Sequence, residues 1–225
     1  MESEKIIELI NVKKVYHMGK ENIKAVNDVS FTIEKGEFCC LLGPSGSGKS
    51  TLLNLMAGIE TVTSGKILIK GKNIQDMSET GLAKFRQRYL GFVFQAYNLI
   101  PSMTALENVE LPLVFKSVPP RRRRKQAREM LKKVGLGSRL NHKPTEMSGG
   151  QQQRVGIARA FVGKPDIVFA DEPTGNLDTR TKEEIHNLFF RLREKYGQTV
   201  VIVTHDPDLA KMCDRSLFMV DGQFV

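Results

Sequence analysis

Cysteine is scarce in this 225-residue chain, and long apolar runs are missing from it. Its three cysteines, of which Cys39 and Cys40 are adjacent, cannot form a disulfide framework or a zinc site, which favours a reducing cytosol. The longest apolar runs, such as 38–42 and 200–203, are far shorter than the ~20 residues that cross a bilayer, so we expect no membrane span. The first residues, MESEKIIELI, carry acids where a secretory signal has a basic segment, so we expect no signal peptide.

Acidic residues are outnumbered by basic ones, and the basic excess is concentrated in one segment. The chain has 34 Lys and Arg against 25 Asp and Glu, which gives a net charge of +9 and a pI near 9.5. Between Gln95 and Gly150 there are 11 basic and 4 acidic residues, including the run Arg121–Lys125. A pI this high invites a nucleic-acid or membrane-surface interpretation, although a solvated basic helix would have the same composition. The 40% hydrophobic and 26% charged content excludes a disordered or fibrous chain.

Short apolar runs alternate with segments of helical periodicity along most of the chain. Strands are predicted at 6–12, 25–33, 37–42, 66–69, 91–94, 167–170, 199–203 and 216–220. Helices are predicted at 49–57, 81–88, 149–161 and 179–195, with a short one before the last strand and a mostly helical stretch at 104–134. We expect Pro112 and Pro119-Pro120 to break that stretch into separate helices. The pattern indicates an α/β core with parallel strands and an inserted helical lobe.

A glycine-rich loop between the predicted strand 37–42 and the helix 49–57 has the phosphate-binding pattern G-x-x-x-x-G-K-[ST]. Backbone N–H groups of such a loop point at phosphate oxygens, and three glycines let the chain bend tightly around them. Lys49 would reach the β- and γ-phosphates, and the Ser50 hydroxyl would bind Mg²⁺. The residues of this loop are Gly43, Pro44, Ser45, Gly46, Ser47, Gly48, Lys49, Ser50 and Thr51.

Polar residues follow three of the predicted strands. Asp171 and Glu172 end the strand 167–170, where Asp171 fits a Mg²⁺-holding carboxylate and Glu172 a general base for the attacking water. An acidic strand end in solvent is the alternative for this pair. His205 follows the strand 199–203 and is suited to hydrogen bonding with a γ-phosphate, although a structural histidine would occur there equally well. Gln95 follows the strand 91–94 and is a candidate ligand of Mg²⁺ or water.

A second glycine-rich turn, Ser148-Gly149-Gly150-Gln151, opens the predicted helix 149–161 and presents another helix N-terminus to an anion. By itself this turn is an ordinary helix cap. In order, however, GPSGSGKST, MSGGQQQRVGIARA, DEPTGNLD and THD resemble the motifs of the ATP-binding-cassette (ABC) ATPases over essentially the whole chain. One departure is Met147, where that family usually has Leu, and we expect little effect from it.

The resemblance implies an α/β fold with a P-loop NTPase core of mostly parallel strands, an antiparallel β subdomain and an inserted α-helical subdomain. Residues 1–225 would form one ABC ATPase domain. The RecA-like core and β subdomain would cover 1–94 and 151–225, and the helical subdomain about 95–150. The family dimerises head to tail around two ATP molecules, each held by the phosphate loop of one chain and the SGGQ turn of the other.

The resemblance also implies a role for each site residue. Gly43 to Thr51 would hold the ATP phosphates, and Tyr16 would stack on adenine, unless it is a surface tyrosine of an edge strand. Ser148, Gly149, Gly150 and Gln151 would close on the γ-phosphate of the partner's ATP, with Asp178 at the dimer interface. Catalysis would use Glu172, His205 and Gln95, and Mg²⁺ would be bound by Ser50, Gln95 and Asp171.

Within the family, the segments ADEPTGNLD, SGGQQQRV, 94–101 and 104–109 resemble those of the lipoprotein-releasing, macrolide-exporting and cell-division group. This similarity implies an ATP-hydrolysing subunit that energises an integral-membrane permease for export, lipoprotein release or mechanotransmission. It would be cytoplasmic and peripheral, held at the inner face of the plasma membrane by the permease, with no nucleic-acid partner. The basic run Arg121–Lys125 would then lie near that membrane face. Two alternatives stay open: a soluble ABC ATPase acting on nucleic acid or ribosomes, and a nucleotide-binding switch without turnover.

Overall fold

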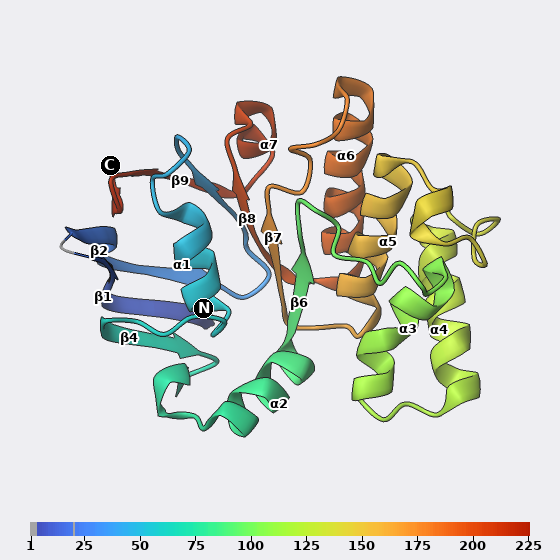
Figure 1. The fold of residues 1–225 in the computed structure, drawn as a ribbon, viewed down its shortest axis with the longest axis horizontal. Coiled ribbons are helices and arrows are strands. Elements are labelled where there is room, and N and C mark those ends of the chain that lie inside the picture. The colour runs from blue at the N-terminus through green and yellow to red at the C-terminus, as the bar shows by residue number, and fades with distance from the viewer. Residues whose placement is uncertain (1–3, 20) are drawn as a thin grey trace. The chain divides into compact units, whose positions relative to one another are not determined.

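The structure is a computed structural model that describes residues 4–19 and 21–225. The chain contains both strands and helices (Figure 1) and divides into two compact units. The first unit comprises 1–86 and 199–225, and the second comprises 87–198. The predicted division into a helical subdomain of about 95–150 and a remainder stays a prediction. Among the helices of the described residues, none is long and apolar enough to cross a membrane.

A four-stranded antiparallel sheet makes up much of the first unit, with the strand order β2-β1-β4-β5. Its strands are β1 (Lys5–Met18), β2 (Glu21–Glu34), β4 (Ser64–Ile69) and β5 (Lys72–Asn73). The first two are longer than the predicted 6–12 and 25–33, because their polar ends continue to pair beyond the alternating apolar segments. The short β5 was not predicted, since two polar residues carry no alternation.

The first unit also contains three parallel strands with β3 in the centre, between β8 and β9. They are β3 (Phe38–Leu42), β8 (Thr199–Thr204) and β9 (Arg215–Val220), and β10 (Gln223–Phe224) pairs antiparallel to β9. Continuous apolar runs form β3 and β8 because both faces of these strands are covered. Helix α1 (Lys49–Met56) contacts β2 and β8, and α7 (Pro207–Lys211) contacts β3 and β9.

Two of the three cysteines lie inside this parallel set. Cys39 and Cys40 on β3 are completely buried. Burial raises the pKa of Cys39 to about 12, so its thiol is protonated and unreactive at neutral pH.

The second unit packs helices against a parallel pair of strands, β6 (Leu90–Val93) and β7 (Ile167–Asp171). Its helices are α3 (Ala105–Phe115), α4 (Pro120–Lys133), α5 (Gly149–Val162) and α6 (Thr179–Tyr196). Helix α5 is central, because it contacts α3, α4, α6 and β6. Short 3₁₀ turns occur at Ile74–Asp76 and Pro144–Glu146, and α2 (Glu79–Tyr89) spans the boundary between the two units.

The prediction that Pro112 breaks a helix is wrong, because α3 continues through it. Thr104 caps the N-terminus of α3 in a capping box with Glu107, and this fixes the first turn. The buried side of α3, which includes Leu106, Val109 and Leu113, packs against α5. This packing stabilises the helix enough to offset the missing N–H of one proline. Pro119-Pro120 does separate two helices as predicted, with Pro120 in the first turn of α4.

The aromatic contact between α5 and α6 gives a first prediction. Phe161 is fully buried, and its ring centroid lies 6.2 Å from that of Phe189 in an edge-on arrangement. Phe161→Ala should lower the free energy of unfolding by about 3–5 kcal/mol, because it leaves a cavity. Phe115→Ala is the matched control, since Phe115 is 64% exposed, and it should change stability by no more than about 0.5 kcal/mol. Urea unfolding followed by circular dichroism measures both, and equal effects would contradict the packing described here.

Candidate functional site

The phosphate loop is shaped by close backbone contacts that only glycine allows. Gly43 follows β3 with φ 149°, and Gly48 precedes α1 with φ 98°. A Cβ at Gly43 would lie 2.1 Å from the carbonyl oxygen of Met219, and one at Gly48 would lie 2.0 Å from that of Ala25. Both distances are far below van der Waals contact. The backbone of the loop is therefore held against β9 and β2, and the N-terminus of α1 that follows has no side-chain cap.

Lys49 is the buried cation of this loop, at 5% exposure. Its Nζ donates to the carbonyl oxygens of Gly43 at 2.8 Å and Pro44 at 2.7 Å, and to Ser47 Oγ at 3.3 Å. These bonds hold the ammonium inside the curve of the loop, and its role toward ATP phosphates stays a prediction.

The turn between β9 and β10 supports the loop from outside. The Gly222 N–H donates to the Ser47 carbonyl at 3.0 Å, and the Gly222 carbonyl accepts from the Asn27 N–H at 2.9 Å. The phosphate loop is thus tied by hydrogen bonds to the last hairpin of the chain and to β2.

Tyr16 lies on β1 with its hydroxyl hydrogen-bonded to Glu60. Glu60 also accepts from Asn54 Nδ2 of α1 at 3.1 Å. Lys14 Nζ lies 5.0 Å from the centroid of the Tyr16 ring and 3.8 Å from the Glu60 carboxylate. Burial, followed by the bond to Glu60, raises the pKa of Tyr16, so the hydroxyl stays protonated. The ring is therefore fixed by its hydroxyl and has a cation near it. Sequence reasoning missed Glu60, which no motif marks.

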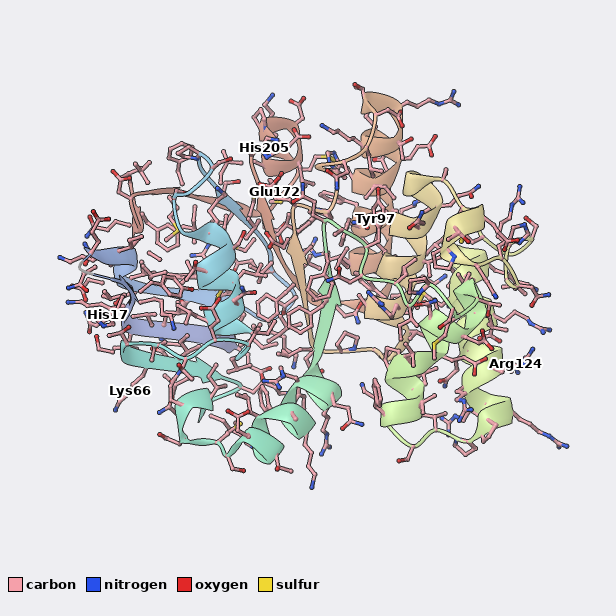
Figure 2. The ribbon with its side chains drawn as sticks, in the orientation of Figure 1. His17, Lys66, Tyr97, Arg124, Glu172 and His205 are labelled. Atoms are coloured by element: carbon pink, nitrogen blue, oxygen red, sulfur yellow. The ribbon has the colours of Figure 1, made fainter. Side chains whose placement is uncertain are left out.

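His205 follows β8 at the edge where the phosphate loop leaves β3. Leu42 and Thr204 are register partners in the parallel pair, so Gly43 and His205 are the next residues of neighbouring strands. His205 is exposed (Figure 2), and Asp206 caps α7 by accepting from the Asp208 N–H at 2.9 Å. The structure therefore brings His205 and the loop to one sheet edge, as the strand pattern predicted.

In the second unit, Gln95 and Glu172 meet at the edge of β6 and β7. Val93 pairs with Ala170, so Gln95 and the carboxylates Asp171 and Glu172 follow neighbouring parallel strands. Gln95 Nε2 donates to Asn176 Oδ1 at 3.3 Å. The position of a Cβ on Gly175 would be 2.8 Å from Gln95 Nε2 and 3.3 Å from Glu172 Oε2, which places both side chains around this glycine. Glu172 (Figure 2) has φ 42°, a strained conformation for a residue with a side chain.

The SGGQ turn and Asp178 are helix caps in this unit. Ser148 Oγ accepts from the Gln151 N–H at 3.3 Å, and Gln151 Oε1 accepts from the Ser148 N–H at 3.1 Å. A Cβ on Gly149 would lie 2.7 Å from the hydroxyl of Tyr97, so the turn packs closely against the segment after Gln95. Asp178 caps α6, and the bonds from Thr181 lower its pKa, which keeps the carboxylate ionised at neutral pH.

Two residues of α5 support these loops and were not predicted. Gln153 is fully buried, and its Nε2 donates to the Pro173 carbonyl, next to Glu172, at 2.5 Å. Arg159 donates to the carbonyls of Tyr97 and Asn98, both at positive φ, at 2.9 and 2.6 Å. A signal for Gln153 was available, since it shares helical spacing with the apolar side of α5 at Gly156, Ile157 and Ala160. A polar residue on such a side needs a buried partner.

The predicted site residues thus divide between the two units. Tyr16, Gly43–Thr51 and His205 belong to the first, and Gln95, Ser148–Gln151, Asp171, Glu172 and Asp178 belong to the second. Within residues 4–19 and 21–225, no group of three or more His, Cys, Asp or Glu side chains could hold a metal ion. The individual roles of the predicted site residues toward nucleotide and metal stay predictions.

Comparison with known proteins identifies the family. A family model described as ABC transporter matches residues 26–175. The chain belongs to the ABC transporter family. An uncharacterized ABC transporter ATP-binding protein of Thermotoga maritima is 51% identical over 91% of this chain and 87% of that protein. The lipoprotein-releasing system ATP-binding protein LolD of Bacteroides fragilis is 46% identical, covering 91% of this chain and 94% of LolD.

Solved structures confirm the predicted fold of this ABC transporter chain. The cassette MJ0796 of Methanocaldococcus jannaschii, a dimer in a post-hydrolysis state bound to ADP and Pi, matches with a TM-score of 0.91 and 47% identity. The match covers 97% of this chain and 96% of that one. The α/β fold is therefore that of a P-loop NTPase, and the chain is an ATP-binding ABC-type ATPase, as predicted.

Gln153 gives the second prediction. Gln153→Leu removes the bond to the Pro173 carbonyl, which should let Glu172 shift and lower kcat for ATP by up to about 100-fold with little change in KM. Gln198→Leu is the matched control, because Gln198 is also buried and its Nε2 donates to a proline carbonyl, that of Pro165, at 2.9 Å.

Both variants should lose about 1–3 kcal/mol of stability, since each leaves a buried carbonyl unpaired. Only Gln153→Leu should lose turnover. Steady-state ATPase kinetics below the unfolding temperature of both variants separate the two effects. An equal fall in kcat in both variants would show a purely structural role and contradict the prediction.

Proposed function

We propose that this chain is the ATP-hydrolysing subunit of a membrane transport complex, and that two copies close head to tail around two ATP molecules. The observation that carries the proposal is the pair of sheet edges, one with the phosphate loop and His205, the other with Gln95, Asp171 and Glu172. The dimeric state of MJ0796, described with ADP and Pi, supports the same assembly for a chain 47% identical to it.

In this proposal the phosphate loop and Lys49 bind the ATP phosphates, and the SGGQ turn of the second copy covers the γ-phosphate. The N-terminus of α5 and the loop before α1 both present backbone N–H groups, so bound ATP supplies the negative charge that draws two copies together. Tyr16 would stack on the adenine, with its ring held by Glu60. Hydrolysis and loss of phosphate remove that charge, which lets the dimer open.

Mg²⁺ fits the donor set that these residues offer. The Ser50 hydroxyl, the Asp171 carboxylate and the Gln95 amide are oxygen donors of the kind that Mg²⁺ prefers. Because the Gln95 amide nitrogen is bonded to Asn176, its oxygen is the atom suited to a cation. When bound, the ion would neutralise charge on the β- and γ-phosphates.

Turnover would depend on Glu172 as the general base that orients the attacking water. Its strained backbone and its place beside Gln95 hold the carboxylate at the edge of β7. His205, at the other edge, would hydrogen-bond the γ-phosphate, and Asp178 would lie at the dimer interface.

The finer role that we propose is export, lipoprotein release or mechanotransmission through an integral-membrane permease, with the chain held at the inner face of the plasma membrane. The motifs of the lipoprotein-releasing, macrolide-exporting and cell-division group and the 46% identity to LolD support it.

Glu172→Gln tests the ATPase and the dimer together. The variant should bind ATP, lose about 10²- to 10⁴-fold in hydrolysis because the amide cannot act as a base, and accumulate as a dimer. Gel filtration with ATP and a phosphate-release assay measure both properties. Glu183→Gln, an exposed acid of α6, should behave like the unmodified chain. If the Glu172→Gln protein stays monomeric at high protein and ATP concentrations, the proposed head-to-tail dimer around two ATP molecules is wrong.

The membrane partner is tested by purifying the tagged chain from detergent-solubilised native membranes. We expect an integral-membrane protein with few spanning helices and a large extracytoplasmic domain to co-purify. Stimulation of ATP hydrolysis by that protein after reconstitution would support the coupling. Recovery of an importer-type permease with a solute-binding protein would contradict the proposed export or release role while leaving the ATPase assignment intact.

A further inference from the structure

Helix α4 presents a row of basic side chains that its own unit does not neutralise. Residues 120–133 contain eight basic residues and one acidic residue, Glu129. Arg121, Lys125, Arg128 and Lys132 are all exposed and follow one another at helical spacing, so they form one row, called here the basic row. The row is about 16 Å long at 1.5 Å per residue. The opposite side of α4, with Ala127, Met130 and Leu131, is buried.

The other cations nearby already have partners inside the unit. Arg123 pairs with Glu110 at 3.2 Å, and that carboxylate is only 12% exposed. Lys116 donates to the carbonyls of Gly163 at 2.8 Å and Arg88 at 3.1 Å. Glu107 is hydrogen-bonded to Thr104 in the N-terminal cap of α3. The bonds from Thr104, and to a smaller extent the positive charge of Arg124, lower the pKa of Glu107. These contacts engage Glu107 and Glu110, and Glu129 is the single acid of α4, so positive charge predominates along the basic row.

The charge arrangement also disfavours an isolated helix. The first turn of α4 contains no acidic residue and begins with consecutive arginines, which opposes the positive end of the helix dipole. An external layer of negative charge would offset this cost.

Two exposed apolar side chains precede the basic row closely in the sequence. Val114 and Phe115, the last residues of α3, are 41% and 64% exposed. Four residues, 116–119, separate Phe115 from the start of α4. Arg124 marks the arginine cluster in Figure 2. A purely polyanionic ligand such as nucleic acid or an acidic polypeptide leaves apolar tips in water. A phospholipid surface takes up both features, because headgroups attract the cations and the acyl boundary accepts the apolar side chains.

We propose that the basic row, together with Val114 and Phe115, binds the surface of an anionic phospholipid bilayer directly. This contact goes beyond the proposed function, because it needs neither the permease nor ATP. It would hold the chain at a membrane before or between encounters with its partner.

The test is co-sedimentation of the purified full chain, without nucleotide or permease, with phospholipid vesicles. Vesicles of phosphatidylcholine with phosphatidylglycerol should bind the chain, and pure phosphatidylcholine should not. Binding to the anionic vesicles should weaken as salt increases. The triple variant Arg121→Gln, Lys125→Gln, Arg128→Gln should lose affinity by about 100-fold, at roughly fivefold per charge.

The matched control is Lys24→Gln, Lys66→Gln, Lys72→Gln, which removes the same charge from exposed positions of the first unit. This control should keep nearly all of the affinity. Phe115→Ala should weaken binding by about tenfold, and this loss should persist at high salt because it is apolar. Both triple variants and Phe115→Ala should keep the solution ATPase activity, which shows that they are folded and separates this test from the proposed function.

Three outcomes would overturn the proposal. The first is absence of binding to anionic vesicles. The second is an equal loss in the two triple variants, which would indicate only the net charge of the chain. The third is that duplex DNA or polyglutamate competes fully while Phe115→Ala binds vesicles like the unmodified chain. That result would show a polyanion-binding surface rather than a membrane-binding one.

Discussion

The register of two parallel strand pairs is the constraint on which the site depends. Leu42 opposite Thr204, and Val93 opposite Ala170, fix where the chain leaves each pair of strands. A shift of one residue would turn every side chain of a strand to its other face. It would also move the phosphate loop relative to His205, or Gln95 relative to Glu172. Because β3, β7 and β8 are buried along their whole length, burial alone does not select the register. The register must therefore be selected by the glycine and proline turns at the strand ends and by the helices packed on the strands.

Both edges carry polar groups in costly arrangements that neighbouring elements support. Lys49 is a buried cation whose ammonium is satisfied by the carbonyls of its own loop. Glu172 is strained, and the buried Gln153 of α5 holds the next residue in place. Because α5 also begins with the SGGQ turn, the first turns of one helix connect the segment around Glu172 with the turn that, in our proposal, would meet a second copy. A displacement of the first turns of α5 would therefore move both the SGGQ turn and the support of Glu172.

Sequence patterns predicted the order of the main elements and the motif residues, because strand–loop–helix transitions with glycine and terminal acids are local signals. They failed where the cause is distant in the chain. Pro112 stays inside a helix because α5 packs on it, and the polar ends of β1 and β2 pair only because their partner is present. Glu60, Gln153 and Arg159 act through contacts 20 to 62 residues away, so only the spacing of Gln153 on an apolar side gave a hint.

The hydrogen bond between Gly222 and Ser47 has a consequence for how this chain can be handled and fused. The hairpin of β9 and β10 is distant in sequence from the loop that begins at residue 43, yet its turn donates a hydrogen bond to that loop. Deleting this hairpin would remove that support from the phosphate loop, even though the hairpin residues belong to no motif. A tag or a domain placed in this hairpin would therefore disturb the nucleotide-binding loop as well.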